Sequence, residues 1–327
     1  MNKKQIKKYL NYLGLKDYFS FKPINCELCG FSKNSIIKNI ISWNNNKFGY
    51  HPIAVCKNCG FVFQKYRSSK KFYKKFYEEF YRKKIYKNLS PSKEFLTDQK
   101  KRGERIFKYI KNMLPKKGTV LDVGSSVGLM LLPYKKMGWK IIGNDPDLTF
   151  VEYGKKKYNL PIECIQSEDM KLKQNSLDLI IIAGSLEHCY DPNKVLQICA
   201  NAAKKNSLLI LEGRGEPRAT SKYYFNHNHH RYFSLNTLEL MMIKHGWKPL
   251  ITTMYPISGP TREGGTWSIG KLSKKLSKSK FQELIKNGKK ESAISVKEKY
   301  RYYDLINQNL NPMRGDYRFV KKNEKNY

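Results

Sequence analysis

Four of the seven cysteines in this 327-residue chain form two units of the same pattern. The units read Cys26-Glu-Leu-Cys29-Gly and Cys56-Lys-Asn-Cys59-Gly. In such a knuckle the backbone amides can point at the thiolates, and the glycine permits the positive φ that the turn needs. Two knuckles supply four sulfur ligands, a closed tetrahedral set that is typical of structural zinc. We therefore predict a structural Zn²⁺ site in a ribbon of short strands spanning about residues 20–66.

Two alternatives for the paired cysteines are a redox motif and a disulfide framework. A redox motif has one Cys-x-x-Cys beside a βαβ unit, and disulfide frameworks belong to secreted proteins. The N-terminal stretch lacks the apolar core of a secretory signal, and no apolar run reaches membrane-spanning length. We therefore expect a cytoplasmic protein without a membrane span. The remaining cysteines have no ligand spacing and are expected to be small buried residues, namely Cys164, Cys189 and Cys199.

A second set of chemically capable residues begins in the stretch TVLDVGSSVG (119–128), where an apolar run closes on Asp122. The loop that follows has glycine at its first and last positions. A dinucleotide fingerprint would have three glycines and would place a pyrophosphate on the next helix. Ser125 and Ser126 fill the middle of this loop instead. The loop therefore admits the close approach of a ligand to the backbone, and its pattern alone leaves the identity of that ligand open.

Polar residues also follow three later apolar runs. Asp145 ends the run KIIGND, at a place where a carboxylate can accept both hydroxyls of a ribose. The segment 166–169 (Gln-Ser-Glu-Asp) follows the next run, and the segment 185–188 (Ser-Leu-Glu-His) follows the one after it. In open α/β sheets, ligands bind outside the carboxyl ends of the strands. These segments are therefore expected to meet at one edge of a sheet.

The elements needed to position these residues alternate between strands and helices, which predicts a parallel sheet covered on both faces. Two final antiparallel strands are expected in PLITTMYPI and TWSIGKL. The expected parallel strands are 119–123, 140–143, 162–165, 177–183 and 207–212, and the helices between them include 129–137, 149–158 and 193–203.

The motifs LDVGSSVG, GNDPD, SLDLIIIAGSLEHCYDP and LLILEG resemble, in order and spacing, those of class I S-adenosylmethionine-dependent methyltransferases. The resemblance covers about residues 100–250. It implies an α/β, Rossmann-like fold with a mostly parallel seven-stranded sheet, here preceded by the small N-terminal zinc-ribbon domain. S-adenosylmethionine has a zwitterionic amino acid and a sulfonium but no phosphate, in agreement with the two-glycine loop.

The resemblance also implies roles for individual residues. Asp122 would orient the amino group of the cofactor, and Asp145 would bind its ribose. Ser125-Ser126 stand where many relatives have Cys-Gly, and the usual acidic residue after the third strand is Gln166 or is displaced to Glu168. The other expected cofactor-binding residues are Gly124, Ser125 and Gly128 at the methionine end, Ser167 and Glu168 beside the adenine, and Ser185.

Transfer to a hydroxyl or a carbon acid requires removal of a proton, a task that histidine performs near neutral pH. His188 is expected where acceptor and cofactor meet, and Glu187 either assists it or caps the next helix. The segment NHNHHRYF (226–233) holds three of the six histidines. It resembles a segment of the relatives in which His230 stands at the matching position. Three interpretations of this cluster stay open: a base or substrate site, a polar surface loop, or a metal site.

Four segments are expected along the chain: an N-terminal segment with the zinc ribbon (1–66), linker helices (67–117), the methyltransferase domain (118–273) and a basic, partly helical tail (274–327). The linker contains KKFYKKFYEEFY, with aromatic residues at helical spacing. We favour an amphipathic helix that docks the ribbon onto the next domain over a surface on which bases stack.

The formal net charge is +36. Clustered Lys and Arg would indicate a nucleic-acid partner, but here the lysines are scattered over the whole chain. Such a distribution favours compositional bias over a recognition stripe.

Two knuckles, the phrase CGFVFQ and an FYEEFY helix before the methyltransferase motifs further resemble a bacterial group that modifies sugars, surface glycans and natural products, over about residues 20–255. The leading hypothesis is methylation of a small-molecule acceptor, a nucleotide sugar or a surface-glycan precursor. One alternative is an RNA base methyltransferase, although the chain lacks an Asn-Pro-Pro-aromatic motif after the fourth strand. The other is a nucleic-acid-binding protein with a degenerate methyltransferase fold.

Overall fold

The computed structural model describes residues 11, 22–44, 47–85, 90–214, 225, 228–262, 265–288, 292 and 294–299. Within them, the main sheet has seven strands in the order β12-β13-β10-β9-β6-β7-β8. β13 runs antiparallel to its neighbours β10 and β12, and the other pairs are parallel, which confirms the predicted fold class. The strands are β6 (Thr119–Val123), β7 (Lys140–Asp145), β8 (Ile162–Cys164), β9 (Leu177–Ala183), β10 (Ala203–Arg214), β12 (Trp247–Thr253) and β13 (Gly265–Leu272).

The strand order reverses between β6 and β9, which makes their carboxyl ends the topological switch point of the sheet. Neighbouring side chains on a strand point to opposite faces, and here both faces are apolar. On β6, Val120 packs in one core cluster while Leu121 packs in the other. The parallel sheet is therefore buried on both sides, as the near-continuous apolar runs predict.

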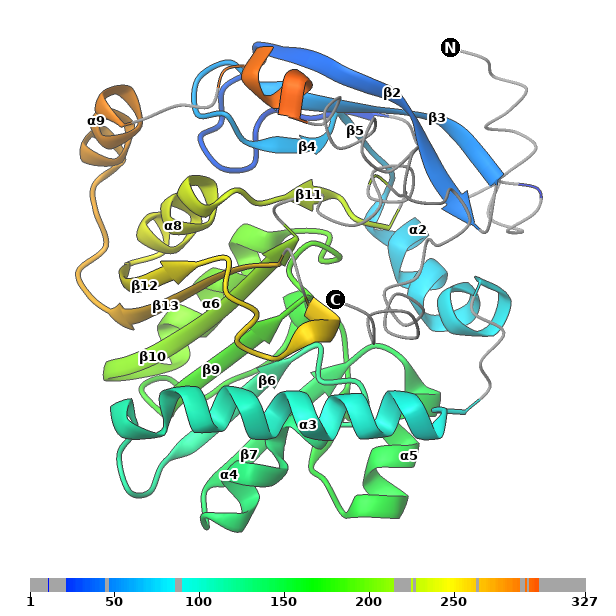
Figure 1. Cartoon of the computed structure of the whole chain (residues 1–327), viewed down its shortest axis with the longest axis vertical. Helices are drawn as coiled ribbons and strands as arrows, with labels where there is room; N and C mark the ends of the chain where they lie inside the picture. Colours follow the sequence, from blue (N-terminus) through cyan, green and yellow to red (C-terminus); the bar gives the residue numbers. More distant parts are fainter. Residues whose placement is uncertain are drawn as a thin grey trace, which may run out of the picture.

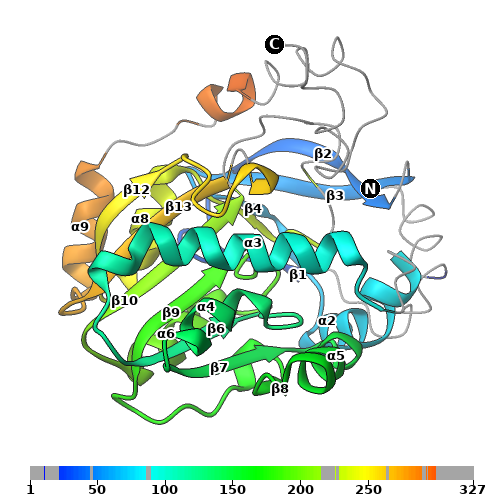
Figure 2. The ribbon, with the colours of Figure 1, turned by 60° about the horizontal axis from the view of Figure 1, so that its bottom comes forward.

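Helices cover the two faces (Figure 2). α3 (Lys93–Ile110), α4 (Leu132–Lys136) and α5 (Leu148–Tyr158) contribute to one core cluster. α6 (Pro192–Ala202) and α8 (Leu235–Lys244) contribute to the other. The helix predicted at 129–137 is divided between the short turn η4 (Leu129–Leu131) and α4.

Helix α3 approaches η4 closely because Gly103 has no side chain. A Cβ at this position would lie 2.6 Å from the Cα of Met130. Ile106 and Ile110, on the same side of the helix, are fully buried. α3 thus packs directly on the methyltransferase-type sheet, although it precedes the first strand of that sheet.

The ribbon forms a second sheet with the order β11-β4-β3-β2 (Figure 1). Its strands from the N-terminal part are β2 (Asn34–Asn44), β3 (Lys47–Cys56) and β4 (Val62–Gln64). β11 (Arg231–Tyr232) comes from far along the chain, between β10 and α8. A short antiparallel pair, β1 (Lys22–Pro23) with β5 (Tyr66–Arg67), flanks the ribbon.

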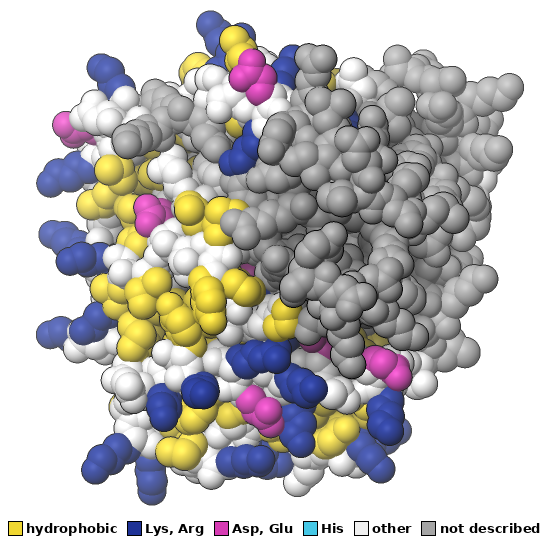
Figure 3. Space-filling model, in the orientation of Figure 1, with side chains coloured by type: hydrophobic (Ala, Val, Ile, Leu, Met, Phe, Trp, Pro, Cys, Tyr) yellow, Lys and Arg dark blue, Asp and Glu magenta, His cyan; other side chains and the backbone are white. Residues whose placement is uncertain are grey.

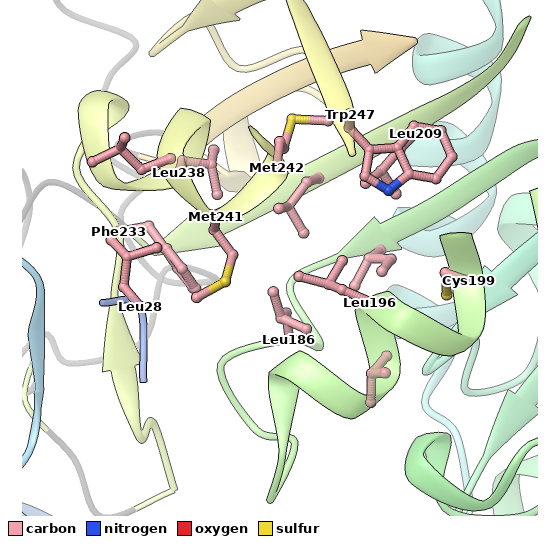
Figure 4. Packing of buried hydrophobic residues seen from close by; sticks show 14 of the residues in the cluster. Leu28, Leu186, Leu196, Cys199, Leu209, Phe233, Leu238, Met241, Met242 and Trp247 are labelled. Atoms are coloured by element: carbon pink, nitrogen blue, oxygen red, sulfur yellow. The ribbon is translucent and has the colours of Figure 1, made fainter. Parts of the chain in front are cut away.

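The ribbon and the main sheet share one hydrophobic core (Figure 4). Leu28, in the first knuckle, is fully buried and lies near Phe233 and Met241. Phe61, after the second knuckle, has its ring centroid 5.3 Å from that of Phe233. The ribbon is therefore packed against the helices of the methyltransferase-type domain.

The aromatic linker forms α2 (Lys70–Lys75), which continues as the wider π-helical segment η2 (Phe76–Ile85). Phe72, Tyr73 and Phe76 are buried. The ring of Tyr73 lies 6.0 Å from that of Tyr190, in the loop after β9. These contacts support the docking interpretation of this helix, because the three rings face the interior of the molecule.

Two expectations need correction or extension. Cys164 is exposed, because it ends the edge strand β8, whereas Cys189 and Cys199 are buried as predicted.

The C-terminal segment contains α9 (Lys278–Asn287), whose Phe281 and Ile285 join the core beside α8. Beyond α9, residues 294–299 are helical, and residues 300–327 lie outside the described residues.

The surface agrees with a scattered positive charge. On the face shown in Figure 3, Lys and Arg side chains are dispersed among neutral and apolar ones rather than gathered in a stripe. Among the described residues, no helix combines the length and the apolar character needed to cross a membrane.

Gly103→Ala should destabilise the protein by about 1–3 kcal/mol, because the added methyl group overlaps the backbone of Met130. This loss opposes the gain of about 1 kcal/mol that alanine normally brings to a helix. Urea unfolding measures the net change in the free energy of unfolding. Lys101→Ala, at an exposed position of α3, is the control and should change stability little. A Gly103→Ala variant as stable as the wild type would contradict the packing of α3 on η4.

Candidate active site

The loop after β6 has the close-approach geometry that its glycines predict. Gly124 and Gly128 have φ of +72° and +76°. A Cβ on Gly124 would lie 2.5 Å from the Cβ of Ser185, in the loop after β9. The Ser185 hydroxyl donates a hydrogen bond of 2.6 Å to the carbonyl of Val123. The loops after β6 and β9 are thus in contact at the switch point.

Asp145 ties a third loop to this place. One carboxylate oxygen accepts a 2.9 Å hydrogen bond from the backbone N–H of Ser126, and the other accepts one from Asp147. Ser125 donates its own N–H to the carbonyl of Asn144, at the end of β7. The carboxyl ends of β6, β7 and β9 therefore converge, and they bring together the residues predicted to hold the methionine end and the ribose.

Asp122 is the most unusual group of the site. It is fully buried, and among the described residues neither carboxylate oxygen has a hydrogen-bond partner. The pKa of Asp122 is raised to about 7, chiefly by burial; Arg102 lowers it and the nearby Asp145 raises it. A buried carboxylate without a partner is costly, so its position at the binding edge indicates a site for a cationic group.

Arg102, on α3, was not identified from the sequence. Its guanidinium is buried and donates to Glu212 (3.3 Å) and more weakly to the carbonyl of Ala183 (3.5 Å). Burial, together with Arg262, lowers the pKa of Arg102 to about 10. The sequence could have indicated its burial, because Arg102 lies on the apolar side of an amphipathic helix, four residues before the buried Ile106. A positive and a negative side chain thus lie buried near the switch point.

Ser167 and Glu168, predicted beside the adenine, are both buried in the short turn η5 (Ser167–Asp169). The Ser167 hydroxyl accepts a 3.1 Å hydrogen bond from the amide of Asn144. Glu168 accepts one of the same length from the N–H of Asp191, the residue that caps α6. Ser167 is therefore connected to β7, whereas Glu168 is held at the start of α6.

The loop after β9 presents His188 beside the aromatic linker. Its Nδ1 lies 2.9 Å from the carbonyl of Asn228. Because a carbonyl only accepts, Nδ1 carries the proton, and Nε2 is left with a lone pair. The Tyr77 hydroxyl lies 3.2 Å from Nδ1 and donates to the same carbonyl at 3.3 Å, so it can accept from Nδ1 without competing for its proton. This arrangement fixes both the orientation and the tautomer of the His188 ring.

The histidine next to His188 is His229, whose ring lies 4.8 Å away. The ligand atoms of Glu187, His188 and His229 lie within 4.8 Å of one another. His229 and His230 are 5% and 0% exposed, which removes the surface-loop interpretation for these two residues. The third histidine of the cluster, His227, lies outside the described residues.

His230 faces the other way. Its ring packs on Tyr73 at 4.4 Å, and its Nδ1 lies 3.3 Å from the carbonyl of Cys189. Burial lowers the pKa of His230 well below its usual value, and Arg67 and Arg231 lower it further. The structure thus brings His229 to the acceptor side, while a catalytic role for His230 stays a prediction.

The four knuckle cysteines converge as predicted. Cys26 and Cys59 have their sulfurs 3.5 Å apart, as do Cys29 and Cys56, and all four lie within 4.8 Å. A tetrahedral zinc with Zn–S bonds of about 2.3 Å requires sulfurs about 3.8 Å apart. The four sulfurs therefore fit a zinc ion and are consistent with a small zinc-binding domain.

Comparison with known proteins defines the class of the main domain. Residues 121–211 match the model of a family described as "Methyltransferase domain". Together with the strand order and the two-glycine loop, this match shows that the chain carries a class I methyltransferase domain of the Rossmann-like fold.

Curated relatives match a similar length of the chain. Ubiquinone biosynthesis O-methyltransferase of Rhodopseudomonas palustris (strain HaA2) is 29% identical over 97 residues, which are 28% of this chain and 38% of the relative. The protein of the same name from Nitrobacter winogradskyi is 30% identical over 95 residues, 28% of this chain and 36% of the relative. The chain thus spans well under half the length of these relatives.

Solved structures resemble the chain over about half its length. A putative S-adenosylmethionine-dependent methyltransferase from Listeria monocytogenes has a TM-score of 0.44 and 14% identity, and covers 52% of this chain and 99% of its own. A possible histamine N-methyltransferase from Thermotoga maritima has a TM-score of 0.42 and 18% identity, and covers 54% and 92%.

Metal analysis of the purified protein should find about one zinc ion per chain, since the four sulfurs form one closed set. Cys56→Ser should remove the zinc and unfold the ribbon, because structural zinc contributes on the order of 10 kcal/mol of apparent binding free energy. Cys164→Ser, at an exposed cysteine outside the cluster, is the matched control and should retain the metal. A folded ribbon without metal would refute the assignment.

Proposed function

We propose that this protein is an S-adenosylmethionine-dependent methyltransferase that acts on a small-molecule acceptor. The observation that carries the proposal is the buried carboxylate of Asp122, which has no hydrogen-bond partner among the described residues and lies under a two-glycine loop at the switch point. A cationic amino group would satisfy this carboxylate, and the loop would admit the rest of the methionine end. The residues present therefore fit the cofactor.

Further residues are available for the other parts of the cofactor. Arg102 would offer a cation to the methionine carboxylate, since its charge acts on Asp122 and its Nε lacks a partner among the described residues. Asp145 would accept the ribose hydroxyls, because it ends β7 at the binding edge and each carboxylate oxygen can accept more than one hydrogen bond. Ser167 and Glu168 would border the adenine, as the resemblance implies.

The chemical task left to the chain is limited. The cofactor, when bound, supplies a methyl group already activated by the sulfonium. The protein must hold an acceptor in line and accept its proton. His188 is suited to this step because its Nδ1 proton is fixed by the carbonyl of Asn228, which leaves Nε2 as the proton acceptor. Glu187 and His229 are close enough to stabilise the imidazolium that would form.

The acceptor is proposed to be a nucleotide sugar or a surface-glycan precursor. The combination of the ribbon, the aromatic linker and the methyltransferase motifs supports this class by resemblance. The relatives' names refer to O-methyl transfer in ubiquinone biosynthesis, which supports a small-molecule acceptor and an oxygen nucleophile. The scattered distribution of lysine along the sequence favours a small acceptor over RNA.

The direct experiment supplies methyl-labelled cofactor with sugar nucleotides, with lipid-linked glycan precursors, with phenolic quinone precursors, or with bulk RNA. Label is expected in the sugar nucleotide or glycan fraction, with one S-adenosylhomocysteine formed for each methyl group transferred. Label in the phenolic compounds would retain the activity and change the acceptor. Label in RNA alone, or in no fraction, would overturn the proposal.

Cofactor binding should depend on pH through Asp122. Its pKa of about 7 lies above the ordinary value for Asp, so the carboxyl is largely protonated below neutrality and loses its attraction for an ammonium group. About one-tenth is ionised at pH 6 and half at pH 7, so the apparent Kd should be about fivefold higher at pH 6. Asp122→Asn should weaken binding and flatten this profile in calorimetric titration. A wild-type Kd independent of pH would argue against the contact.

His188→Gln should slow methyl transfer by about 10²- to 10⁴-fold while the Kd for the cofactor stays unchanged, because general-base catalysis contributes on this scale. Single-turnover kinetics separate the chemical step from binding. His245→Gln, at a buried histidine hydrogen-bonded to Asn193 outside the site, is the control and should retain the rate. Equal rates for His188→Gln and wild type would place proton removal elsewhere.

A further inference from the structure

The first cysteine knuckle contains an acidic residue that binds arginine side chains. Glu27 lies between Cys26 and Cys29, and its carboxylate accepts a 3.1 Å hydrogen bond from Nε of Arg231. Nη2 of Arg231 donates to the other oxygen at 2.5 Å, which completes a two-point contact. Arg67 donates to Glu27 at 3.0 Å. The side chains of Arg231 and Arg67 are 0% and 5% exposed, so this ion-pair cluster is largely shielded from water.

The opposite edge of the Arg231 guanidinium holds the loop after β9. Nη1 donates to the carbonyls of Leu186 and Cys189 at 2.8 and 2.6 Å, and Nη2 contacts the carbonyl of Tyr190 at 3.4 Å. These carbonyls flank Glu187 and His188. One arginine thus connects the knuckle with the loop that carries the proposed base.

The ribbon also holds the other wall of the site through its backbone. In the pairing of β11 with β4, Arg231 lies opposite Phe63. Gln64 donates its backbone N–H to the carbonyl of His230 and its side-chain amide to that of His229, both at 2.9 Å. His229 and His188 therefore both depend on contacts with the ribbon or its knuckle.

The geometry of these contacts explains why an arginine is required. A guanidinium is a planar fork whose donors point in fixed directions, so two-point binding to a carboxylate also orients its remaining N–H groups. Glu27 in this way directs Nη1 of Arg231 at the loop carbonyls. Because Cys26 and Cys29 flank Glu27, closure of the knuckle around a metal fixes the carboxylate as well.

We propose that Glu27 and Arg231 are positioning residues that couple the cysteine knuckle to the acceptor side of the active site, and that the knuckle thereby orients His188. This inference rests on the proposed function for the role of His188. The coupling itself is a property of the loop and can be measured without an acceptor.

Hydrogen exchange followed by mass spectrometry tests the coupling in the zinc-loaded protein. Glu27→Gln should raise amide exchange in residues 185–191 at least tenfold, because the guanidinium loses the charge that orients it. Exchange in β6 and zinc content should stay at wild-type values. Lys57→Gln is the matched control, because Lys57 is exposed and occupies the equivalent position in the second knuckle. It should leave the loop unchanged.

Arg231→Lys provides the second arm, because a lysine cannot bind the carboxylate at two points and still reach the three carbonyls. Arg231→Lys should raise amide exchange in residues 185–191 in the same way as Glu27→Gln. The double variant should exchange no faster in this loop than the faster of the two single variants. Unchanged exchange in both variants, a rise spread equally over the main sheet, or multiplying effects in the double variant would overturn the coupling. If one of the two single variants fails to fold while the other shows wild-type exchange, the coupling is overturned as well.

Once an acceptor is identified, Glu27→Gln should lower kcat about tenfold or more with an unchanged Kd for the cofactor. If the wild-type protein transfers no methyl group, the proposed function fails, and the exchange experiment still decides the coupling. Local loosening of the loop with an unchanged kcat would refute the assignment of Glu27 as a positioning residue.

Discussion

The pairing of β11 with β4 is the constraint on which the rest of the structure depends. This short segment belongs to the ribbon sheet by its backbone and to the loop after β9 by its Arg231 side chain. A strand pair of two residues contributes little alone, but it lies over a core that both parts of the chain share. The segment consequently fixes how the ribbon sits above the carboxyl ends of the main sheet. The same segment also holds the loop after β9 through the hydrogen bonds of Arg231.

Two groups of buried charge follow from this arrangement. In the group of Glu27, Arg67 and Arg231 each charge has an opposite charge in contact, although Nε and Nη1 of Arg67 have no partner among the described residues, and Arg231 also holds backbone carbonyls. The group at the switch point is different, because Asp122 has no hydrogen-bond donor among the described residues while Arg102 is paired with Glu212. Buried charges that are paired are best understood as structural, and an incompletely satisfied one at a binding edge indicates a ligand. The contrast separates the support of the site from its cofactor side.

Much of the fold could be predicted from the sequence because a parallel sheet buried on both faces leaves long apolar runs. β9 was predicted with the observed bounds, and the turns after β6, β7 and β9 followed from their glycine and acidic residues. The cysteine cluster could also be predicted from short sequence motifs, because two knuckles of fixed spacing define it. Cys164 was placed wrongly because nothing in its spacing reveals that its strand lies at the edge of the sheet.

The residues that were missed depend on contacts between distant parts of the chain. Arg231 and Glu27 are 204 positions apart, and no periodicity connects them. His230 was selected from the histidine cluster by resemblance, and the position of His229 beside His188 was missed for a related reason. Neighbouring residues of an extended segment point in opposite directions, so the pairing register decides which imidazole reaches His188. Arg102 required knowledge of which helix face lies on the switch point.

The central claim is that the binding edge at the switch point accepts a sulfonium nucleoside rather than a dinucleotide. Equilibrium dialysis of the zinc-loaded protein against labelled S-adenosylmethionine tests this most directly. The account predicts saturable binding of about one molecule per chain, displaced by S-adenosylhomocysteine and unaffected by NAD. Displacement by NAD at comparable concentration, or no saturable binding, would contradict it.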